Sequence, residues 1–223
     1  SSSAIARHSM RTLRRTWIFM IDSSSSFGGN RPWSRSVTRL VSFAEKNGKH
    51  VIGIAGQKTG IGVSMLSMDL ARTYIEFGKP ALLVDASHLD LDRSSIADER
   101  DIPFDLYNMS QKSNTGLATI DLAEFAHLLP SGRQAYKRMF AEAAKHGVQV
   151  IVDLPPVSSG PGMATPGFMV AGAACETVYL VCLTGDVSKA ELSDCIEICK
   201  INRIALGGII PNDWKLMGSG LLS

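Results

Sequence analysis

The sequence predicts a doubly wound α/β domain, with a mostly parallel sheet and helices on both of its faces. Two observations predict it: runs of Val, Ile and Leu recur along the chain, and segments of helical character lie between them. Strands that are apolar throughout are buried on both faces, and helices between such strands act as parallel crossovers. A chain of 223 residues that is 45% hydrophobic is long enough to bury the core of one such domain.

The elements of this domain are expected between residues 49 and 223. The expected strands are 50–55, 80–87, 148–156, 177–183 and 205–212, and the expected helices are about 64–78, 133–147 and 188–201. Before them, residues 1–20 contain a predicted basic amphipathic helix over 4–20. Residues 21–48 are rich in Ser, Gly and Pro at their start and are expected to be a linker and lead-in.

Composition and charge exclude several classes of function. The net charge of +2 is too small to favour nucleic acid as a partner. Four cysteines without C-x-x-C spacing indicate reduced, structural thiols in a cytoplasmic compartment. No apolar run has the length of a membrane span, and the start lacks a signal-peptide pattern.

The segment "GQKTGIGVS" lies between an expected strand and an expected helix and resembles a phosphate-binding loop. Gly62 and Ser64 occupy the places of the second glycine and of the hydroxyl residue in G-x-x-x-x-G-K-[ST], and Gly56 and Gly60 add two further glycines, but Val63 occupies the place of the lysine. A glycine loop at a helix N-terminus can close its backbone N–H groups around phosphate. The alternative is a tight turn that binds nothing.

Two acidic residues, Asp85 and Asp153, each end an apolar strand. The carboxyl ends of parallel strands share one edge of the sheet with the glycine loop, which is where doubly wound folds bind their ligands. An unpaired carboxylate at the end of a buried strand is costly, which favours a functional role. Capping, or pairing with a nearby lysine, is the structural alternative.

Taken together, "GQKTGIGVS", "ALLVDAS" and "VIVDLPPV" resemble the Walker A, A′ and B elements of the MinD/ParA-like P-loop ATPases. The "DLPPV" ending is most similar to the bacterial tyrosine kinases (BY-kinases) that regulate capsule and exopolysaccharide export. "HSMRTLRRT" resembles their oligomerisation helix, with His8, Arg11 and Arg14 in the three motif positions. The segments 114–120 and 128–140 resemble the region that these kinases place before Walker B.

The resemblance implies roles for individual residues. Gly56, Gly60, Gly62 and Ser64 face the phosphates of ATP or ADP, and Ser64, Asp85 and Asp153 hold Mg²⁺ and its waters. Asn212 matches the asparagine that such proteins use near adenine. Lys58 stands where ParA-type loops carry a lysine that reaches a partner subunit's nucleotide; it either partly replaces the missing lysine or is a solvated loop residue.

Departures from the family pattern predict weak or absent nucleotide binding. Val63 removes the cation that steadies the β- and γ-phosphates, Ser87 stands in place of the second aspartate of the A′ element, and the arginine downstream of it is absent. His8 replaces the acid of the oligomerisation motif. The tail "NDWKLMGSGLLS" contains no tyrosine, so a C-terminal autophosphorylation cluster is missing. Together with Val63 in place of the lysine, this means that strong kinase activity is not expected.

The resemblance implies a cytoplasmic regulator or scaffold of exopolysaccharide synthesis or export at the inner face of the membrane. Its implied partners are its own kind and a membrane polysaccharide co-polymerase or export protein. The N-terminal helix is a subunit contact, a solvated face or a basic patch on anionic lipid. The alternative function is a slow MinD/ParA-type ATPase that couples nucleotide state to dimerisation or localisation, including a pilus-assembly ATPase of the TadZ/CpaE kind.

Overall fold

A computed structural model describes residues 17–18, 34–89, 117–123, 132–160 and 162–212 of the chain. Its main feature is a seven-stranded sheet in the order β1-β9-β8-β2-β5-β3-β4, in which every neighbouring pair is parallel. The strands are β1 (Trp17–Ile18), β2 (Val51–Gly56), β3 (Ala81–Asp85), β4 (Leu117–Asp121), β5 (Gln149–Asp153), β8 (Thr177–Leu183) and β9 (Leu206–Asn212). A short antiparallel hairpin, β6 (Ser158–Gly160) and β7 (Met163–Ala164), follows β5.

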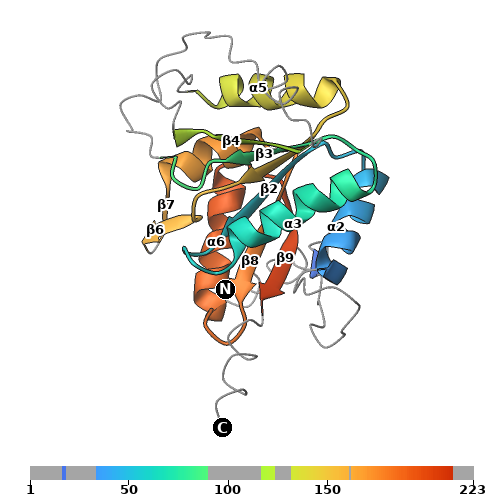
Figure 1. The fold of residues 1–223 in the computed structure, drawn as a ribbon. Helices are drawn as coiled ribbons and strands as arrows, with labels where there is room; N and C mark the ends of the chain where they lie inside the picture. Colours follow the sequence, from blue (N-terminus) through green and yellow to red (C-terminus); the bar gives the residue numbers. More distant parts are fainter. Residues whose placement is uncertain (1–16, 19–33, 90–116, 124–131, 161, 213–223) are drawn as a thin grey trace.

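Helices cover both faces of the sheet, which confirms the predicted doubly wound fold (Figure 1). On one face, α2 (Ser34–Lys46) and α3 (Val63–Glu76) pack side by side. On the other face lie α5 (Arg133–Lys145), α6 (Lys189–Ile201) and the short π-helix η3 (Phe168–Gly172). None of the described helices is both long enough and apolar enough to cross a lipid bilayer.

The central strands are apolar throughout because they contribute to two cores. Every residue of β2, β5 and β8 is buried. Along β2, Ile52 and Ile54 pack under α2 and α3, whereas Val51 and Ala55 belong to the core of the opposite face. Successive side chains of a strand point to opposite faces, so this alternation follows from strand geometry.

Helix α2 lies within the segment expected to be a linker and lead-in. Its side chains Val37, Leu40, Val41 and Ala44 are at most 1% exposed and pack into the core. Their i, i+3, i+4, i+7 spacing is that of an amphipathic helix. Helix α2, which begins at Ser34, therefore packs against the rest of the α/β domain.

Other differences concern short elements. Strand β4 was not among the expected strands, although it continues the sheet beyond β3. Trp17 and Ile18 pair with β9 as a strand, so the expectation of a helix over 4–20 is wrong for these two residues. Residues 1–16, which include His8, Arg11 and Arg14, lie outside the described part of the chain.

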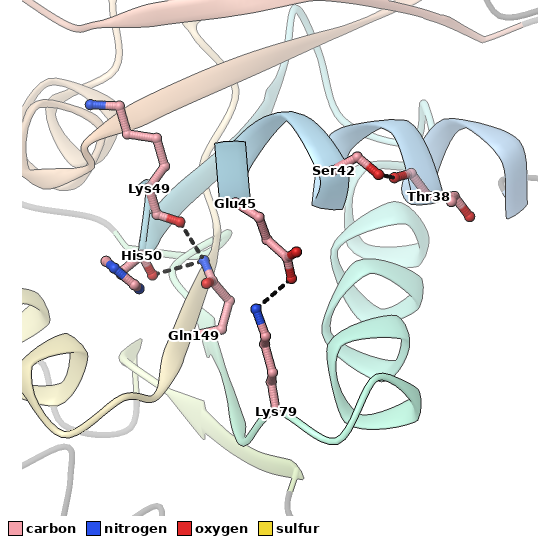
Figure 2. Close-up of polar contacts among 7 residues, drawn as sticks. All are labelled: Thr38, Ser42, Glu45, Lys49, His50, Lys79 and Gln149. Carbon is pink, nitrogen blue, oxygen red and sulfur yellow. Dashed lines mark hydrogen bonds and ion pairs between the residues drawn. The ribbon is translucent and has the colours of Figure 1, made fainter. Parts of the chain in front are cut away.

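Polar contacts join neighbouring segments at the amino ends of the strands (Figure 2). The Nε2 group of Gln149, at the start of β5, donates to the carbonyl oxygens of Lys49 at 3.3 Å and His50 at 2.9 Å. Lys79, just before β3, forms an ion pair with Glu45 of α2, with 2.6 Å between Nζ and Oε1. The first contacts join β5 to the segment before β2, and the ion pair joins the segment before β3 to α2, all at the amino ends of the strands.

Candidate functional site

The glycine loop connects β2, the middle strand of the sheet, to the N-terminus of α3. Gly60 and Gly62 have φ angles of 75° and 89°, in the left-handed region that other residues rarely adopt. Gly62 is the N-cap of α3, and no side chain caps the first turn of this helix. The amide groups at the start of α3 are therefore not occupied by a side-chain cap, as a phosphate cradle requires.

The Val63 side chain packs against the first glycine of the loop. A Cβ atom on Gly56 would lie 2.8 Å from Val63 Cγ2 and 2.7 Å from Ile61 Cδ1, so only glycine fits beneath these two side chains. Ile61 is buried and Val63 is partly buried against the core of the α2 and α3 face. An apolar side chain therefore occupies the position from which a lysine would extend to phosphate.

The carboxyl group of Asp153 lies at the end of β5, next to the loop. It is 3% exposed, it accepts a hydrogen bond from the Ser64 side chain, and its Oδ1 atom has no hydrogen-bond partner among the described residues. Burial, together with the negative charge of Asp85, raises the pKa of Asp153 to about 6, although the Ser64 hydrogen bond and the charge of His88 oppose this shift. A buried carboxylate oxygen without a partner is costly, and a bound cation is one way to satisfy it.

Asp85 and Asp153 lie in register on adjacent strands, β3 and β5. The Oδ1 atom of Asp85 accepts hydrogen bonds from the backbone N–H of Ser87 at 2.9 Å and from its hydroxyl at 2.6 Å. Ser87, which stands where the family has a second aspartate, therefore holds the first aspartate in place. The structure thus brings Ser64, Asp85 and Asp153 to one side of the loop.

Two other predicted site residues contact the loop differently. Lys58 forms an ion pair with Asp186, in the turn between β8 and α6. Asn212, at the end of β9, is 5% exposed and donates from Nδ2 to the carbonyl oxygen of Ile61 at 2.7 Å. Asn212 was expected near adenine, and in this structure one of its contacts braces the loop itself.

Sequence reasoning missed Asp121, which ends β4 in register with Asp85. Its Oδ1 atom accepts a hydrogen bond from the Ala123 backbone at 2.8 Å. Three aspartates therefore follow one another along the carboxyl edge, at the ends of β4, β3 and β5. The signal was an aspartate that directly follows an apolar residue, Ile120, just as Asp85 and Asp153 directly follow Val84 and Val152. Within the described ranges, no three His, Cys, Asp or Glu side chains are arranged to hold a metal on their own.

Comparison with known proteins adds support for the fold. No protein-family model and no curated protein sequence matches the chain. Among solved structures, the BceF tyrosine kinase domain is 22% identical over 94% of this chain and 88% of its own, with a TM-score of 0.58. The kinase domain of the Escherichia coli tyrosine kinase ETK is 20% identical over 80% of this chain and 73% of its own, with a TM-score of 0.55. The chain therefore shares the α/β fold of these two tyrosine-kinase domains.

Proposed function

We propose that this chain is a cytoplasmic BY-kinase-like domain with a degenerate nucleotide site, and that it regulates or scaffolds exopolysaccharide biosynthesis or export. The fold shared with two bacterial tyrosine-kinase domains supports this kinship. The observation that carries the proposal is the packing of Val63 against Gly56, because it puts an apolar contact where the phosphate-binding lysine belongs.

The residues that remain fit ATP or ADP with Mg²⁺. The backbone N–H groups of the glycine loop and of the first turn of α3 would bind phosphate, assisted by the positive end of the helix dipole. The Ser64 hydroxyl and the carboxylates of Asp85 and Asp153 would supply oxygen ligands for Mg²⁺, an ion that keeps several waters and binds through few carboxylates. The unpartnered Oδ1 atom of Asp153 supports this assignment. Bound Mg²⁺ would neutralise phosphate charge in phosphoryl transfer.

The absence of the Walker A lysine determines how well such a site binds nucleotide and transfers phosphate. A hydrogen bond to a charged group contributes about 1.5–3 kcal/mol. Loss of a preorganised donor aimed at developing charge slows a reaction by roughly 10²–10³. Because phosphoryl transfer depends almost wholly on positioning and electrostatics, we expect weak nucleotide binding and little or no kinase activity.

The tyrosines also argue against autophosphorylation of the folded domain. Tyr74, Tyr136 and Tyr179 are each 0% exposed, so their hydroxyl groups cannot reach a nucleotide bound at the loop of another copy. Tyr107 lies outside the described residues. A regulatory or scaffolding role is consistent with a domain in which three of the four tyrosines are inaccessible.

The proposed partners are other copies of the chain and a membrane polysaccharide co-polymerase or export protein, at the inner face of the cell membrane. Self-association is assigned to the motif formed by His8, Arg11 and Arg14. These assignments rest on the resemblance of the N-terminal segment and of "DLPPV" to BY-kinases. No nucleic acid is proposed as a partner, because the net charge is only +2.

A second candidate function is a slow ATPase of the MinD/ParA type. Two observations favour it: the Oδ1 atom of Asp153 lacks a hydrogen-bond partner among the described residues, and Lys58 is an exposed cation on the glycine loop. In that case Lys58 would supply the missing charge, and Asp85 and Asp153 would hold the metal. Nucleotide state would then control dimerisation or localisation.

Titration of the purified chain with ATP·Mg²⁺, together with an assay for phosphoryl transfer to protein tyrosine and to water, separates the two candidates. The proposed role predicts a dissociation constant in the high micromolar range or above and no transfer to tyrosine. Tight binding with steady ATP hydrolysis would favour the slow ATPase. Efficient transfer to tyrosine would refute the degenerate site altogether.

A further inference from the structure

Lys58 is the only cation among residues 56–64, and the structure holds it on one particular side of the loop. Its Nζ atom pairs with Oδ2 of Asp186, which follows β8. Strand β8 borders one side of β2, and β5, which ends at Asp153, borders the other side. The ion pair therefore draws the loop's cation away from the side on which Ser64 and Asp153 lie.

Asp186, which pairs with Lys58, lies two residues before Ser188, the N-cap of α6. Ser188 and Glu191 form a capping box at the N-terminus of α6: Ser188 N donates to Glu191 Oε2 at 2.8 Å, and Glu191 N donates to Ser188 Oγ at 3.2 Å. These Ser188 hydrogen bonds, with a smaller contribution from the charge of Lys58, lower the pKa of Glu191. Two carboxylates thus act on Lys58 from a helix start whose geometry is set by its own hydrogen bonds.

We propose that Asp186 is a positioning residue that sets the affinity of the glycine loop for the phosphates of a nucleoside di- or triphosphate, because it competes with them for Lys58. The inference rests on the proposed nucleotide site and adds its regulation. With Lys58 paired to Asp186, phosphate meets backbone amides alone. Once Lys58 is released from Asp186, its side chain supplies phosphate with a cation in place of the missing Walker A lysine.

The strength of the ion pair suits such an exchange. The side chains of Lys58 and Asp186 are 47% and 35% exposed. Exposed pairs of this kind are weak and are screened by salt. A phosphate group carries more charge than a carboxylate and therefore competes well for the same lysine. Removal of Asp186 should accordingly change affinity by a small factor, about two- to fivefold.

The chain offers a matched control. Lys79 and Glu45 form an ion pair whose side chains are 49% and 40% exposed, at the amino edge of the sheet (Figure 2). Glu45→Gln removes one carboxylate from a pair of similar exposure, with the same change of net charge as Asp186→Asn. If net charge alone governs the affinity, the two variants will behave alike.

The experiment is an NMR titration of the chain with ADP·Mg²⁺, which measures dissociation constants into the millimolar range. We expect Asp186→Asn to bind about two- to fivefold more tightly than wild type, and Asp186→Glu and Glu45→Gln to bind as wild type does. The gain should vanish in the double variant Lys58→Met/Asp186→Asn. It should also shrink in about 1 M NaCl, because the Debye length falls to about 3 Å.

Each other result overturns the proposal. Equal affinities for wild type and Asp186→Asn would show that Asp186 does not compete for Lys58. If Asp186→Asn still raises the affinity for ADP·Mg²⁺ in the Lys58→Met background, Asp186 does not act through Lys58. If Glu45→Gln raises the affinity equally, the effect comes from net charge alone. No binding by any variant would also refute it, while the scaffolding role would stand. Efficient transfer of phosphate to tyrosine by the wild type, in a separate assay, would refute the proposed function, while the affinities of the variants would still decide the role of Asp186.

Discussion

Asn212 and Ile61 lie 151 positions apart in sequence, and the side-chain amide of the first donates to the backbone carbonyl of the second at 2.7 Å. Asn212 belongs to β9 and Ile61 to the loop after β2, with β8 between the two strands. The bond is buried. It therefore fixes the glycine loop to a strand that is not the neighbour of β2.

The first prediction concerns this brace. Asn212→Ala should lower the free energy of unfolding by about 1–3 kcal/mol, because it leaves the buried Ile61 carbonyl without this donor. Urea unfolding monitored by circular dichroism measures the change. Asn202→Ala is the control: Asn202 Nδ2 donates to Ile198 O at 2.9 Å, but at the partly buried end of α6. An equal loss of stability in the two variants would mean that the Asn212–Ile61 hydrogen bond contributes no more than the Asn202–Ile198 bond at the end of α6.

The second prediction follows from the pKa of Asp153, which is raised from 3.8 to about 6. Between these values the folded state binds more protons than the unfolded state, so stability falls as pH rises through this window. The wild type should lose on the order of 2–3 kcal/mol relative to Asp153→Asn between pH 4 and pH 7. Denaturant unfolding of both proteins across this range gives the difference, and parallel curves would show that Asp153 titrates normally.

The third prediction restores the missing lysine. Val63→Lys should strengthen binding of ATP·Mg²⁺ by roughly ten- to a hundredfold, since one charge-assisted contact contributes about 1.5–3 kcal/mol. The glycines that shape the loop are unchanged, so the cradle should still form. Calorimetry on both proteins in one buffer is the measurement.

A charge elsewhere on the same turn is the control for the third prediction. Met65 is 38% exposed in the first turn of α3, so Met65→Lys adds the same charge two residues away from the position of the Walker A lysine. We expect Met65→Lys to bind much less tightly than Val63→Lys. If neither variant binds nucleotide, other residues close the pocket, and the loop is vestigial.

The fourth prediction concerns the packing next to the site. A Cβ atom on Gly167 would lie 2.2 Å from the carbonyl oxygen of Leu89 and 3.0 Å from Pro155 Cγ. The backbone of Gly167 is in the ordinary right-handed helical region, so Gly167→Ala is penalised by space and not by conformation. We expect it to cost about 1–3 kcal/mol of stability.

Gly132→Ala provides the comparison for Gly167→Ala. Gly132 precedes α5 in an extended conformation with nothing within 4 Å of its would-be Cβ. Gly132 is also the N-cap of α5, where alanine is less favourable than glycine, so this cost opposes the entropic gain and the replacement should change stability by less than about 1 kcal/mol. Thermal melting of the two variants tests both statements, and equal melting temperatures would contradict the close contact of Gly167 with Leu89.

The fifth prediction concerns self-association through the N-terminal segment. Arg11 and Arg14 are three positions apart, and the motif lacks an acid to pair with them, which favours an acidic partner on another copy. Arg11→Ala/Arg14→Ala should reduce the mass measured by light scattering. Arg72→Ala/Lys137→Ala removes the same charge from exposed positions of α3 and α5. A monomeric wild type, or an unchanged mass of the Arg11 and Arg14 variant, would leave this segment as a solvated or membrane-facing element.

The amino-acid sequence by itself determined the fold class and much of the site. Continuous apolar runs such as 51–55 and 177–183 predict buried strands because both of their faces must leave water, and this requirement is local. The sequence also indicated the glycines of the loop and the aspartates that end β3 and β5, because their chemistry is unusual for their position in the chain. Helix α2 was within reach too, but the Ser-, Gly- and Pro-rich stretch before it masked its spacing of apolar residues.

Only the tertiary structure decided which residues meet at the loop. The Lys58–Asp186 ion pair spans 128 positions and the Asn212–Ile61 bond spans 151. The alignment of Asp121 with Asp85 depends on the register of β4 against β3. Likewise, the contact of Val63 with Gly56 depends on the path of the loop between them. Strand order and register are set by packing summed over the whole domain, and no local pattern of residues records that sum.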